Sequence, residues 1–370
     1  MNILIIGEFS AFAKHLKNGF KQLGHNVTIV KTGDGWKKIE GDSDDIYYEN
    51  NCLKLLGLKI PGSKYIFALK NNRYITNELN KRFCQKKIDL IFVVNYAFLR
   101  TNIFTVGVHI NFIKKSIVNG TKLIMSACGG DPALYYTYPD YYKMIGVKEK
   151  LADDRYSFLL NFSDILIPTC YMYWYSSSKY CDKFGYRVKI NKSIPLPITI
   201  EKKYVFKSCV GNKIIIFHGI NRPINKGTSY IQEAMNRLQN DYPELVKCIC
   251  KGQMAYSEYV KLFDEIDILV DQTSKFGNGW GINAAIGAMK AKCVLTVCKK
   301  ENGEQMEIPH IPFIYIEPDS NQIYETLKEL VLNPERIDTI KKLSRETAEK
   351  FFDCKIIAQK YLNAVNLIEK

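Results

Sequence analysis

The sequence has no long hydrophobic run, and this absence excludes a membrane-spanning segment. A helix that crosses a bilayer needs about 20 consecutive apolar residues, and charged residues interrupt every apolar stretch of this chain before that length. Residues 1–7 contain no basic residue ahead of their short apolar run, so they do not resemble a secretory signal peptide. We therefore expect a cytoplasmic protein.

Metal and disulfide motifs are also missing. The chain has five histidines, no pair of CxxC motifs and no HExxH, so we expect neither a zinc site nor any other metal. Its eleven cysteines form no paired framework. We expect reduced, mostly buried thiols.

Two common nucleotide-binding motifs are absent as well. The turn at 7–12 contains a single glycine, where a dinucleotide-binding domain would carry G-x-G-x-x-G, and there is no Walker A motif. NAD enzymes and P-loop NTPases are therefore disfavoured. Gly7 still precedes a predicted helix N-terminus, where backbone N–H groups can meet an anion or sugar hydroxyls. It is a candidate binding residue for such a group.

Positive charge is plentiful but unevenly distributed. Residues 1–195 contain 28 Lys and Arg against 16 Asp and Glu, whereas residues 196–370 contain 24 against 22. This imbalance indicates that the first half faces an anionic partner, which is a membrane surface, nucleic acid or a phosphorylated substrate. The simpler alternative, in which the charge only keeps the protein soluble, stays open.

Apolar side chains make up 46% of the 370 residues, enough for two domains with a core each. The first domain opens with a predicted strand at 2–6, a helix at 12–23 that Ser10 caps, and a strand at 27–30. Further buried strands are predicted at 89–94, 122–126 and 164–168.

A second strand–helix series follows the proline-rich stretch 193–197, which we take as the interdomain connection. Its predicted strands are 214–218, 246–250, 267–271, 293–297 and 313–316, and its predicted helices are 227–239, 257–264, 281–291, 320–332, 335–350 and 354–368. Two such series predict two doubly wound, Rossmann-like α/β domains that face a cleft. We place these domains at 1–195 and 196–350, followed by a helix at 351–370 that packs back on the first domain.

A basic turn at 218–228 follows the first strand of the second series. Arg222 and Lys226 lie four residues apart beside the N–H groups of a predicted helix N-terminus, and this combination is suited to a diphosphate. The guanidinium offers a planar fork and the ammonium a point charge. Gly219 belongs to the same turn. Two solvated surface cations are the alternative.

A glycine-rich segment about fifty residues further on points to the same ligand. Residues 277–295 are predicted to form a turn, a helix of small residues and a buried strand. Small side chains let a ligand approach closely and let the helix pack tightly on the sheet.

These segments resemble the nucleotide-sugar glycosyltransferases of the GT-B fold, in particular the retaining family-4-like group of bacterial surface polysaccharide synthesis. The resemblance covers nearly the whole chain and is most specific from 214 to 297. Arg222, Lys226 and Gly227 match the family's basic turn. The residues that match its later segment, E-G-F-G-L-P-x-L-E-A-M-A-x-G-K-P-V-I, are Gly279, Trp280, Gly281, Ile282, Lys292 and Val294.

The chain departs from this pattern at the family's two glutamates, which contact the donor sugar and the ribose. The first falls on Asn278, which can still hydrogen-bond a sugar. The second falls on Ile286, or on Gly287 in a shifted alignment, and neither replaces a carboxylate. Glu301 and Glu304 are candidates for a carboxylate supplied to the same cleft, and solvated loop residues are the alternative.

In the first domain, residues 126–131 resemble a family loop in which an aspartate contacts the acceptor or donor sugar. Asp131 takes that place, with a helix cap as the alternative, and Cys128 stands where the family usually has histidine. Tyrosines recur at 132–142, with Lys143 next, and around Trp174 at 171–175, and tyrosines with lysines suit sugar stacking, a lipid interface or ordinary packing.

The resemblance implies a hexosyltransferase that moves a sugar from a nucleotide-diphosphate donor to a glycan or lipid-linked glycan, with retention and without a metal or other cofactor. Its candidate catalytic residues are Arg222, Lys226 and Asp131. Its candidate donor-binding residues are Gly7, Gly219, Asn278, Gly279, Trp280, Gly281, Ile282 and Glu304.

Two other functions stay open. The missing glutamates favour a catalytically degenerate GT-B subunit that binds a glycan or partners an active transferase, and the fold also accommodates sugar-nucleotide epimerases. For either enzyme or subunit, we expect the basic first domain to lie on the anionic inner face of the membrane. We expect no nucleic acid partner, because no recognised binding motif is present.

Overall fold

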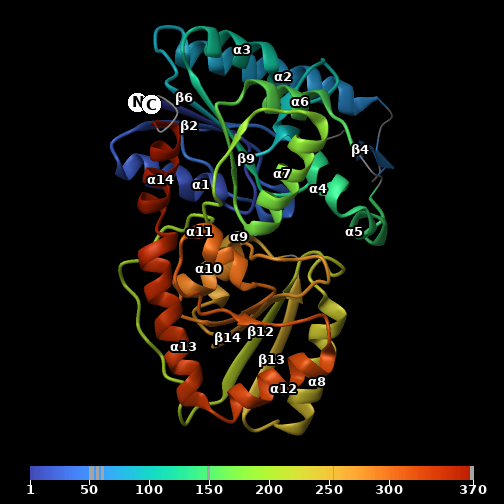
Figure 1. Ribbon diagram of the computed structural model, residues 1–370, viewed down its shortest axis with the longest axis vertical. Coiled ribbons are helices and arrows are strands. Elements are labelled where there is room, and N and C mark those ends of the chain that lie inside the picture. Colours follow the sequence, from blue (N-terminus) through green and yellow to red (C-terminus); the bar gives the residue numbers. More distant parts are fainter. Residues whose placement is uncertain (50–53, 56–57, 60–61, 148–150, 253, 367–370) are drawn as a thin grey trace.

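The computed structural model describes residues 1–49, 54–55, 58–59, 62–147, 151–252 and 254–366. Two parallel sheets, one in each half of the chain, each have helices on both faces (Figure 1). This is the arrangement of two doubly wound α/β domains, and it confirms the predicted fold class.

The N-terminal sheet has seven strands in the order β11-β10-β9-β6-β1-β2-β3, all parallel to their neighbours. The strands are β1 Asn2–Ile6, β2 Asn26–Lys31, β3 Ile46–Tyr47, β6 Leu90–Val93, β9 Lys122–Ala127, β10 Ile165–Pro168 and β11 Lys189–Ile190. Five of them match the predictions to within a residue. The two edge strands, β3 and β11, were missed because two residues carry no periodic signal.

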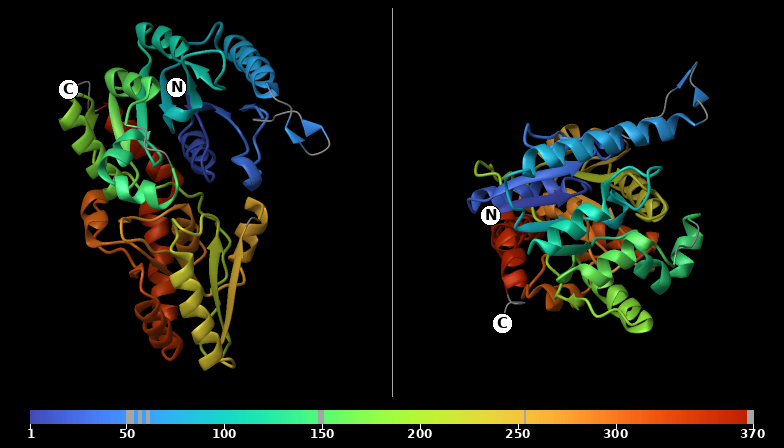
Figure 2. Two further views of the ribbon diagram at one scale, coloured as in Figure 1. Left: turned by 90° about the vertical axis from the view of Figure 1, so that its right-hand side faces the viewer. Right: turned by 90° about the horizontal axis from the view of Figure 1, so that it is seen from above.

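Helices of the N-terminal domain divide between the two faces of this sheet. Helix α1 (Phe12–Gln22) covers one face, and helices from the middle of the domain cover the other. These are α2 Ser63–Phe83, α3 Ile110–Val118, α4 Pro132–Thr137, α6 Asp154–Phe162 and α7 Tyr171–Phe184, whereas α5 Pro139–Met144 follows α4 and adds no residue to this core. Two short strand pairs complete the domain: β4 Lys54–Leu55 with β5 Leu58–Lys59, which projects outward (Figure 2), and β7 Leu99–Arg100 with β8 Val108–His109.

The C-terminal sheet has five parallel strands in the order β13-β12-β14-β15-β16. The strands are β12 Ile214–Ile220, β13 Val246–Gly252, β14 Ile268–Gln272, β15 Cys293–Thr296 and β16 Ile314–Tyr315. The helices are α8 Thr228–Asp241, α9 Tyr256–Leu262, α10 Ile282–Met289, α11 Lys300–Met306, α12 Ser320–Val331 and α13 Pro334–Thr347. Every predicted element of this series is present, and α11 is an addition.

The chain returns to the N-terminal domain at its end. Helix α13 continues through a π-helical turn (Ala348–Phe352) into α14 (Cys354–Asn366), which lies beside α1 (Figure 1). The contact is close because Gly19 of α1 has no side chain: a Cβ there would lie 1.9 Å from the Cys354 carbonyl oxygen. Tyr361 is fully buried in the core that contains Phe12 and Phe92. The domain boundaries at 195 and 350 stay a prediction.

Ser10 does not cap α1, contrary to the prediction. Ala11 stands at the N-cap position, and Ser10 and Ala11 have positive φ angles of 52° and 68°. The carboxylate of Glu8 takes the cap's place from inside the turn. It accepts hydrogen bonds from the backbone N–H groups of Ala13 at 3.1 Å and Lys14 at 2.9 Å. Glu8 is fully buried, and burial raises its pKa to about 7.

This raised pKa predicts a pH-dependent stability difference between the protein and its Glu8→Gln variant. The unfolded chain releases the Glu8 proton near pH 4.5, whereas the folded protein keeps it until about pH 7. The wild type therefore loses stability relative to the variant as pH rises between these values, by up to about 3 kcal/mol. Urea unfolding at pH 5 and pH 8 measures the difference. Glu40→Gln, which changes an exposed carboxylate, is the control, and an equal response of the two variants contradicts the prediction.

Candidate functional site

The loops that follow the strands of the two sheets meet at the junction of the domains. Gly279, after β14, lies so close to Cys170, after β10, that a Cβ on the glycine would be 2.8 Å from the cysteine Cβ. The ring of Tyr141 in α5 is 5.9 Å from that of Phe276. In doubly wound proteins, ligands bind at these carboxyl ends of parallel strands.

Lys226 is held by a buried carboxylate at this junction. Its Nζ donates to Oδ1 of Asp271 at 2.7 Å and to the Asp271 carbonyl at 3.1 Å. Asn283, near the start of α10, donates to the same Oδ1 at 3.3 Å. Asp271 is 1% exposed, and its Oδ2 is buried without a donor among the described residues. The predicted diphosphate ligand Lys226 is therefore already ion-paired.

The turn that carries Lys226 is clamped to the end of β14. Gly227 has a φ of 62°, and a Cβ there would lie 2.5 Å from the Thr273 side chain, so this position requires glycine. The N–H of Thr273 donates to the Lys226 carbonyl at 3.1 Å. The position of Lys226 is thus set by backbone contacts as well as by its ion pair.

His218 supports this turn from inside the domain. Its Nδ1 lies 2.8 Å from the Val270 carbonyl and its Nε2 lies 2.9 Å from Thr228 Oγ1. Burial lowers its pKa to about 4, so the imidazole is neutral at pH 7. It ties β12 to β14 and to the start of α8. Gly219, the next residue, lies beneath the Tyr259 hydroxyl, 3.1 Å from the place of a Cβ.

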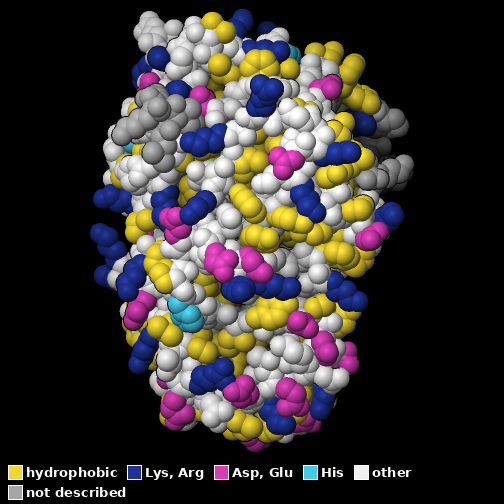
Figure 3. All heavy atoms as spheres, in the orientation of Figure 1, with side chains coloured by type: hydrophobic (Ala, Val, Ile, Leu, Met, Phe, Trp, Pro, Cys, Tyr) yellow, Lys and Arg dark blue, Asp and Glu magenta, His cyan; other side chains and the backbone are white. Residues whose placement is uncertain are grey.

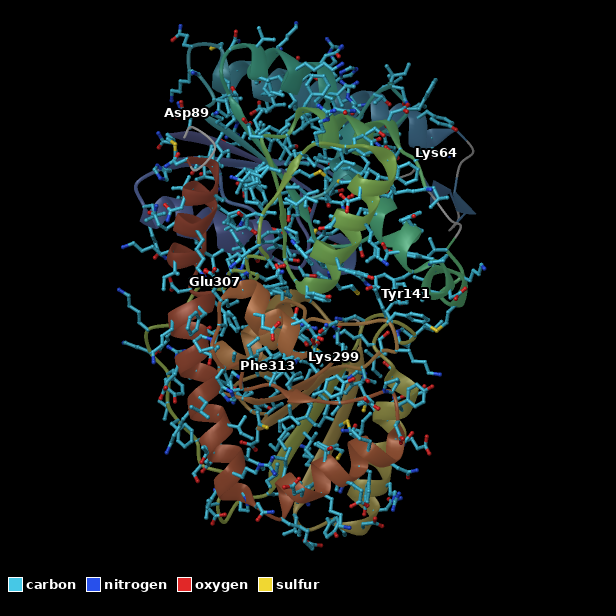
Figure 4. The ribbon with its side chains drawn as sticks, viewed as in Figure 1. Lys64, Asp89, Tyr141, Lys299, Glu307 and Phe313 are labelled. Atoms are coloured by element: carbon cyan, nitrogen blue, oxygen red, sulfur yellow. The ribbon has the colours of Figure 1, made fainter. Side chains whose placement is uncertain are left out.

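Arg222 is the other predicted diphosphate ligand, and it is exposed. It makes no ion pair within the described part of the chain. Its positive charge favours the ionised form of Tyr141, although burial raises the pKa of that phenol overall. Arg222 is therefore near Tyr141 of α5 in the N-terminal domain, which Figure 4 labels. Arg222 is available to an anion, in contrast to Lys226.

Asn278 is used in internal hydrogen bonds. Its Oδ1 accepts from the N–H of Lys299 at 3.1 Å and from Asn302 Nδ2 at 2.6 Å. Asn302, fully buried, accepts in turn from the N–H of Tyr171 at 3.1 Å. This chain of bonds joins the loop after β14 to α11 and to the N-terminus of α7 in the other domain. The predicted contact of Asn278 with a sugar stays a prediction.

Trp280 and Ile282 have buried side chains. Each is 6% exposed, and the indole of Trp280 packs against the rings of Phe313 and Phe352 at 5.5 Å and 5.7 Å. Their side chains belong to the core, and a contact of these two residues with a donor stays a prediction. Gly281 is different, because nothing lies within 4 Å of its Cβ position at the N-cap of α10. The space beside Gly281 at the start of α10 is thus open.

Glu301 and Glu304, the two acidic candidates, both lie in α11 and differ in their surroundings. Glu301 accepts a long hydrogen bond from Asn278 Nδ2 at 3.4 Å. Glu304 is exposed and lines a cavity of about 570 Å³ with Lys299, Lys300, Glu307 and His310. No residue of the Lys226 turn or of α10 lines that cavity. That either glutamate supplies a carboxylate to the donor site stays a prediction.

Asp131 acts as a helix cap in the N-terminal domain. Its Oδ1 accepts from the N–H of Leu134 at 2.9 Å, and burial raises its pKa to about 6. Its contact with a sugar stays a prediction.

Gly7, the candidate after β1, has a φ of 102°, and a Cβ there would lie 2.3 Å from the Phe98 ring. The tyrosines near Asp131 pack on one another, as Tyr135 and Tyr142 stack at 3.6 Å.

Asp271 and Asn283 are site residues that the sequence analysis missed. Asp271 ends a run of buried apolar residues, and a charged residue in that place is a signal that was available. Its pairing with Lys226, forty-five residues away, depends on the order of β12 and β14 in the sheet. Within the described residues, no group of three His, Cys, Asp and Glu side chains is arranged to hold a metal.

Comparison with known proteins places the architecture. No family model and no curated protein matches the sequence. Among solved structures, a sucrose-phosphate synthase from Thermosynechococcus elongatus covers 100% of this chain and 99% of its own, at 12% identity and a TM-score of 0.62. HepE of Anabaena, solved with UDP, covers 99% of this chain and 100% of its own, at 12% identity and a TM-score of 0.59. A putative UDP-N-acetylglucosamine 2-epimerase from Listeria monocytogenes covers 98% of this chain and 94% of its own, at 11% identity and a TM-score of 0.51.

The chain therefore has the GT-B fold. At such low identity the likeness concerns the fold alone, and the same fold serves transferases and epimerases. The activity has to be argued from the site.

The Lys226–Asp271 pair predicts strong coupling between the two positions. Lys226→Met leaves the Asp271 carboxylate buried without its cation, which costs about 3–5 kcal/mol in unfolding free energy. Asp271→Asn costs less, because a lysine can reach water. The double variant Lys226→Met/Asp271→Asn should recover about 1–3 kcal/mol relative to the sum of the single losses. Urea unfolding of the four proteins measures this coupling, and additive losses contradict it.

Proposed function

We propose that the protein is a glycosyltransferase that moves a sugar from a nucleoside diphosphate to a glycan or lipid-linked glycan. The carrying observation is the cationic end of the C-terminal sheet. Arg222 is exposed and makes no ion pair within the described residues, Lys226 lies four residues away, and the space beside Gly281 at the N-terminus of α10 is open. Cations and hydrogen-bond donors of this kind are what a diphosphate group binds. HepE, a structural neighbour, was solved with UDP, which makes UDP the first donor nucleotide to test.

The proposed mechanism rests on charge that develops as the donor breaks. When the bond from the sugar's anomeric carbon to the diphosphate lengthens, negative charge grows on the leaving oxygen. Arg222 and the α10 amides stabilise that charge more in the transition state than in the ground state. Lys226 contributes if the diphosphate draws its Nζ from Asp271, which then keeps Asn283 as a donor.

Retention of anomeric configuration and independence of metal belong to this proposal. Both follow from the resemblance to the family-4-like transferases. They fit a site in which two cations and a helix N-terminus offset the diphosphate charge. A hexose donor, and a role in bacterial polysaccharide synthesis on the inner face of the membrane, rest on the same resemblance and on the basic N-terminal half.

Two alternatives have observations in their favour. A degenerate subunit is favoured by the ion pair that occupies Lys226 and by the apolar Ile286, which is fully buried. An epimerase is favoured by the neighbour from Listeria monocytogenes. Three outcomes of one assay separate them: labelled UDP-sugars yield transfer or hydrolysis products, an epimerised free donor, or no change.

Binding of UDP is the direct test of the site. Arg222→Ala should weaken UDP binding roughly 10–100-fold, because it removes a charge-assisted hydrogen bond without a stabilising role in the fold. Titration calorimetry measures the change, and Arg336→Ala on the exposed surface of α13 is the control. Affinity that Arg222→Ala leaves unchanged removes the guanidinium from the site. A wild type without UDP affinity supports the degenerate subunit.

The Lys226 position needs a variant that keeps the fold. The double variant Lys226→Met/Asp271→Asn removes both charges together and avoids an uncompensated buried carboxylate. Transfer rates for this variant and for Asp271→Asn separate the role of the lysine from that of its partner. We expect slower transfer for the double variant. Equal rates for all proteins exclude Lys226 from catalysis. The anomeric configuration of the product, read by NMR, decides between retention and inversion.

A further inference from the structure

The first half of α2 presents apolar side chains to solvent. Its inner face packs on the domain through Ala68, Ile75 and other buried residues. On the outside, Tyr65, Ile66 and Leu69 are 41%, 65% and 50% exposed. Exposed apolar residues that gather on one helix face mark an interaction surface, whereas isolated ones need no explanation.

A neighbouring loop extends this surface. The side-chain amide of Asn72 donates to the carbonyls of Ile103 at 3.2 Å and Thr105 at 2.9 Å, and so ties the loop to α2. The Phe104 ring lies 5.4 Å from that of Tyr65. Ile103 and Phe104 are 52% and 60% exposed. We call the five exposed apolar residues the α2 patch: Tyr65, Ile66, Leu69, Ile103 and Phe104.

Cations surround the α2 patch. Lys64, Lys70 and Arg73 are exposed on the same helix, and the Lys64 ammonium lies 4.8 Å from the centre of the Tyr65 ring. The first acidic residue of α2 is Glu78, which pairs with Arg82 at 3.2 Å and lies more than a turn beyond Arg73. The outward face is therefore apolar in its middle and positive around it.

The α2 patch lies on the N-terminal domain away from the other domain. Helix α2 crosses the top of the molecule (Figures 1 and 2), and Figure 4 labels Lys64 at its outer end. In the space-filling view, hydrophobic side chains and cations intermingle along the upper right of the N-terminal domain (Figure 3). A partner on α2 would leave the loops at the domain junction uncovered.

We infer that the α2 patch docks the N-terminal domain onto an anionic lipid bilayer. Charge complementarity selects this partner: three cations flank the apolar side chains and residues 63–77 of α2 include no acid, in the half of the chain with 28 Lys and Arg against 16 Asp and Glu. The apolar side chains enter the boundary between headgroups and acyl chains, and the lysines reach lipid phosphates beside them. The inference goes beyond the proposed transferase activity and holds whether or not sugar is transferred.

Sedimentation with lipid vesicles tests the inference. The wild type should sediment with vesicles that contain phosphatidylglycerol and should not sediment with vesicles of pure phosphatidylcholine. Salt at about 0.5 M should release it from the anionic vesicles. Replacing Lys64, Lys70 and Arg73 with Glu should weaken binding by at least roughly 100-fold. The variant Ile66→Ser/Leu69→Ser/Phe104→Ser should bind these vesicles at least roughly 10-fold more weakly than the wild type.

A matched control removes exposed apolar residues elsewhere. Val118→Ser/Val205→Ser/Leu332→Ser changes side chains that are 86%, 92% and 51% exposed outside the α2 patch, and it should bind vesicles as the wild type does. Circular dichroism and UDP titration of each variant show whether the fold and the donor site are intact. Failure of the proposed function is thereby separate from failure of this inference.

Three results would overturn the inference. The first is a wild type that ignores anionic vesicles or binds neutral ones equally. The second is an α2 patch variant that binds as tightly as the control. The third is a monomer–dimer equilibrium, seen by sedimentation velocity, that the α2 patch variants abolish without vesicles, because a second copy of the chain is then the partner.

Discussion

The close packing of α14 on α1 is the constraint on which the arrangement of the two domains depends. The contact requires Gly19, because any side chain there would collide with the Cys354 carbonyl. Ile198, in the connection between the domains, exchanges backbone hydrogen bonds with Phe352 and Cys354 at 2.8 Å and 2.9 Å. The two segments that cross between the domains, one at Ile198 and one at 352–354, are thus hydrogen-bonded to each other, and the second is packed on α1.

Because the crossing is anchored, the loops at the carboxyl ends of the two sheets meet in a defined way. The chain of bonds from Asn278 through Asn302 to Tyr171 spans the junction. His15 of α1 adds another link, with Nε2 3.0 Å from the Tyr256 hydroxyl and a pKa that burial lowers to about 3. Residues expected to contact a donor are therefore partly engaged in holding the domains together. The exposed Arg222 is the clearest exception.

Lys226 shows how one residue can serve the fold and the proposed reaction. Its partner Asp271 is almost fully buried, so the pair stabilises the end of the sheet while it places a cation beside α10. A simple Lys226→Ala variant confuses the two roles, since lost activity can come from a destabilised domain. The distinction between an ion-paired lysine and a free arginine four residues earlier comes from the structure alone.

The sequence by itself determined the two sheets, most of their strands, helix α1 and the helices of the second series other than α11. Apolar runs such as 2–6 and 268–270 are buried on both faces in a parallel sheet, so they are visible without knowledge of their neighbours. It also located the basic turn at Arg222 and Lys226, because helix N-termini after strands have a local signature.

Tertiary structure decided what each side chain contacts, and partners such as those of Trp280 and Lys226 are distant in sequence. Glu8 rather than Ser10 caps α1, Trp280 turns into the core toward Phe352, and Asp271 takes Lys226. None of these choices follows from spacing, since each depends on which elements lie opposite one another in space. Helix α2 was not predicted, because its inner face includes the polar Asn72 and its outer face is partly apolar. Periodicity reports burial only where one face of an element is apolar and the other is not.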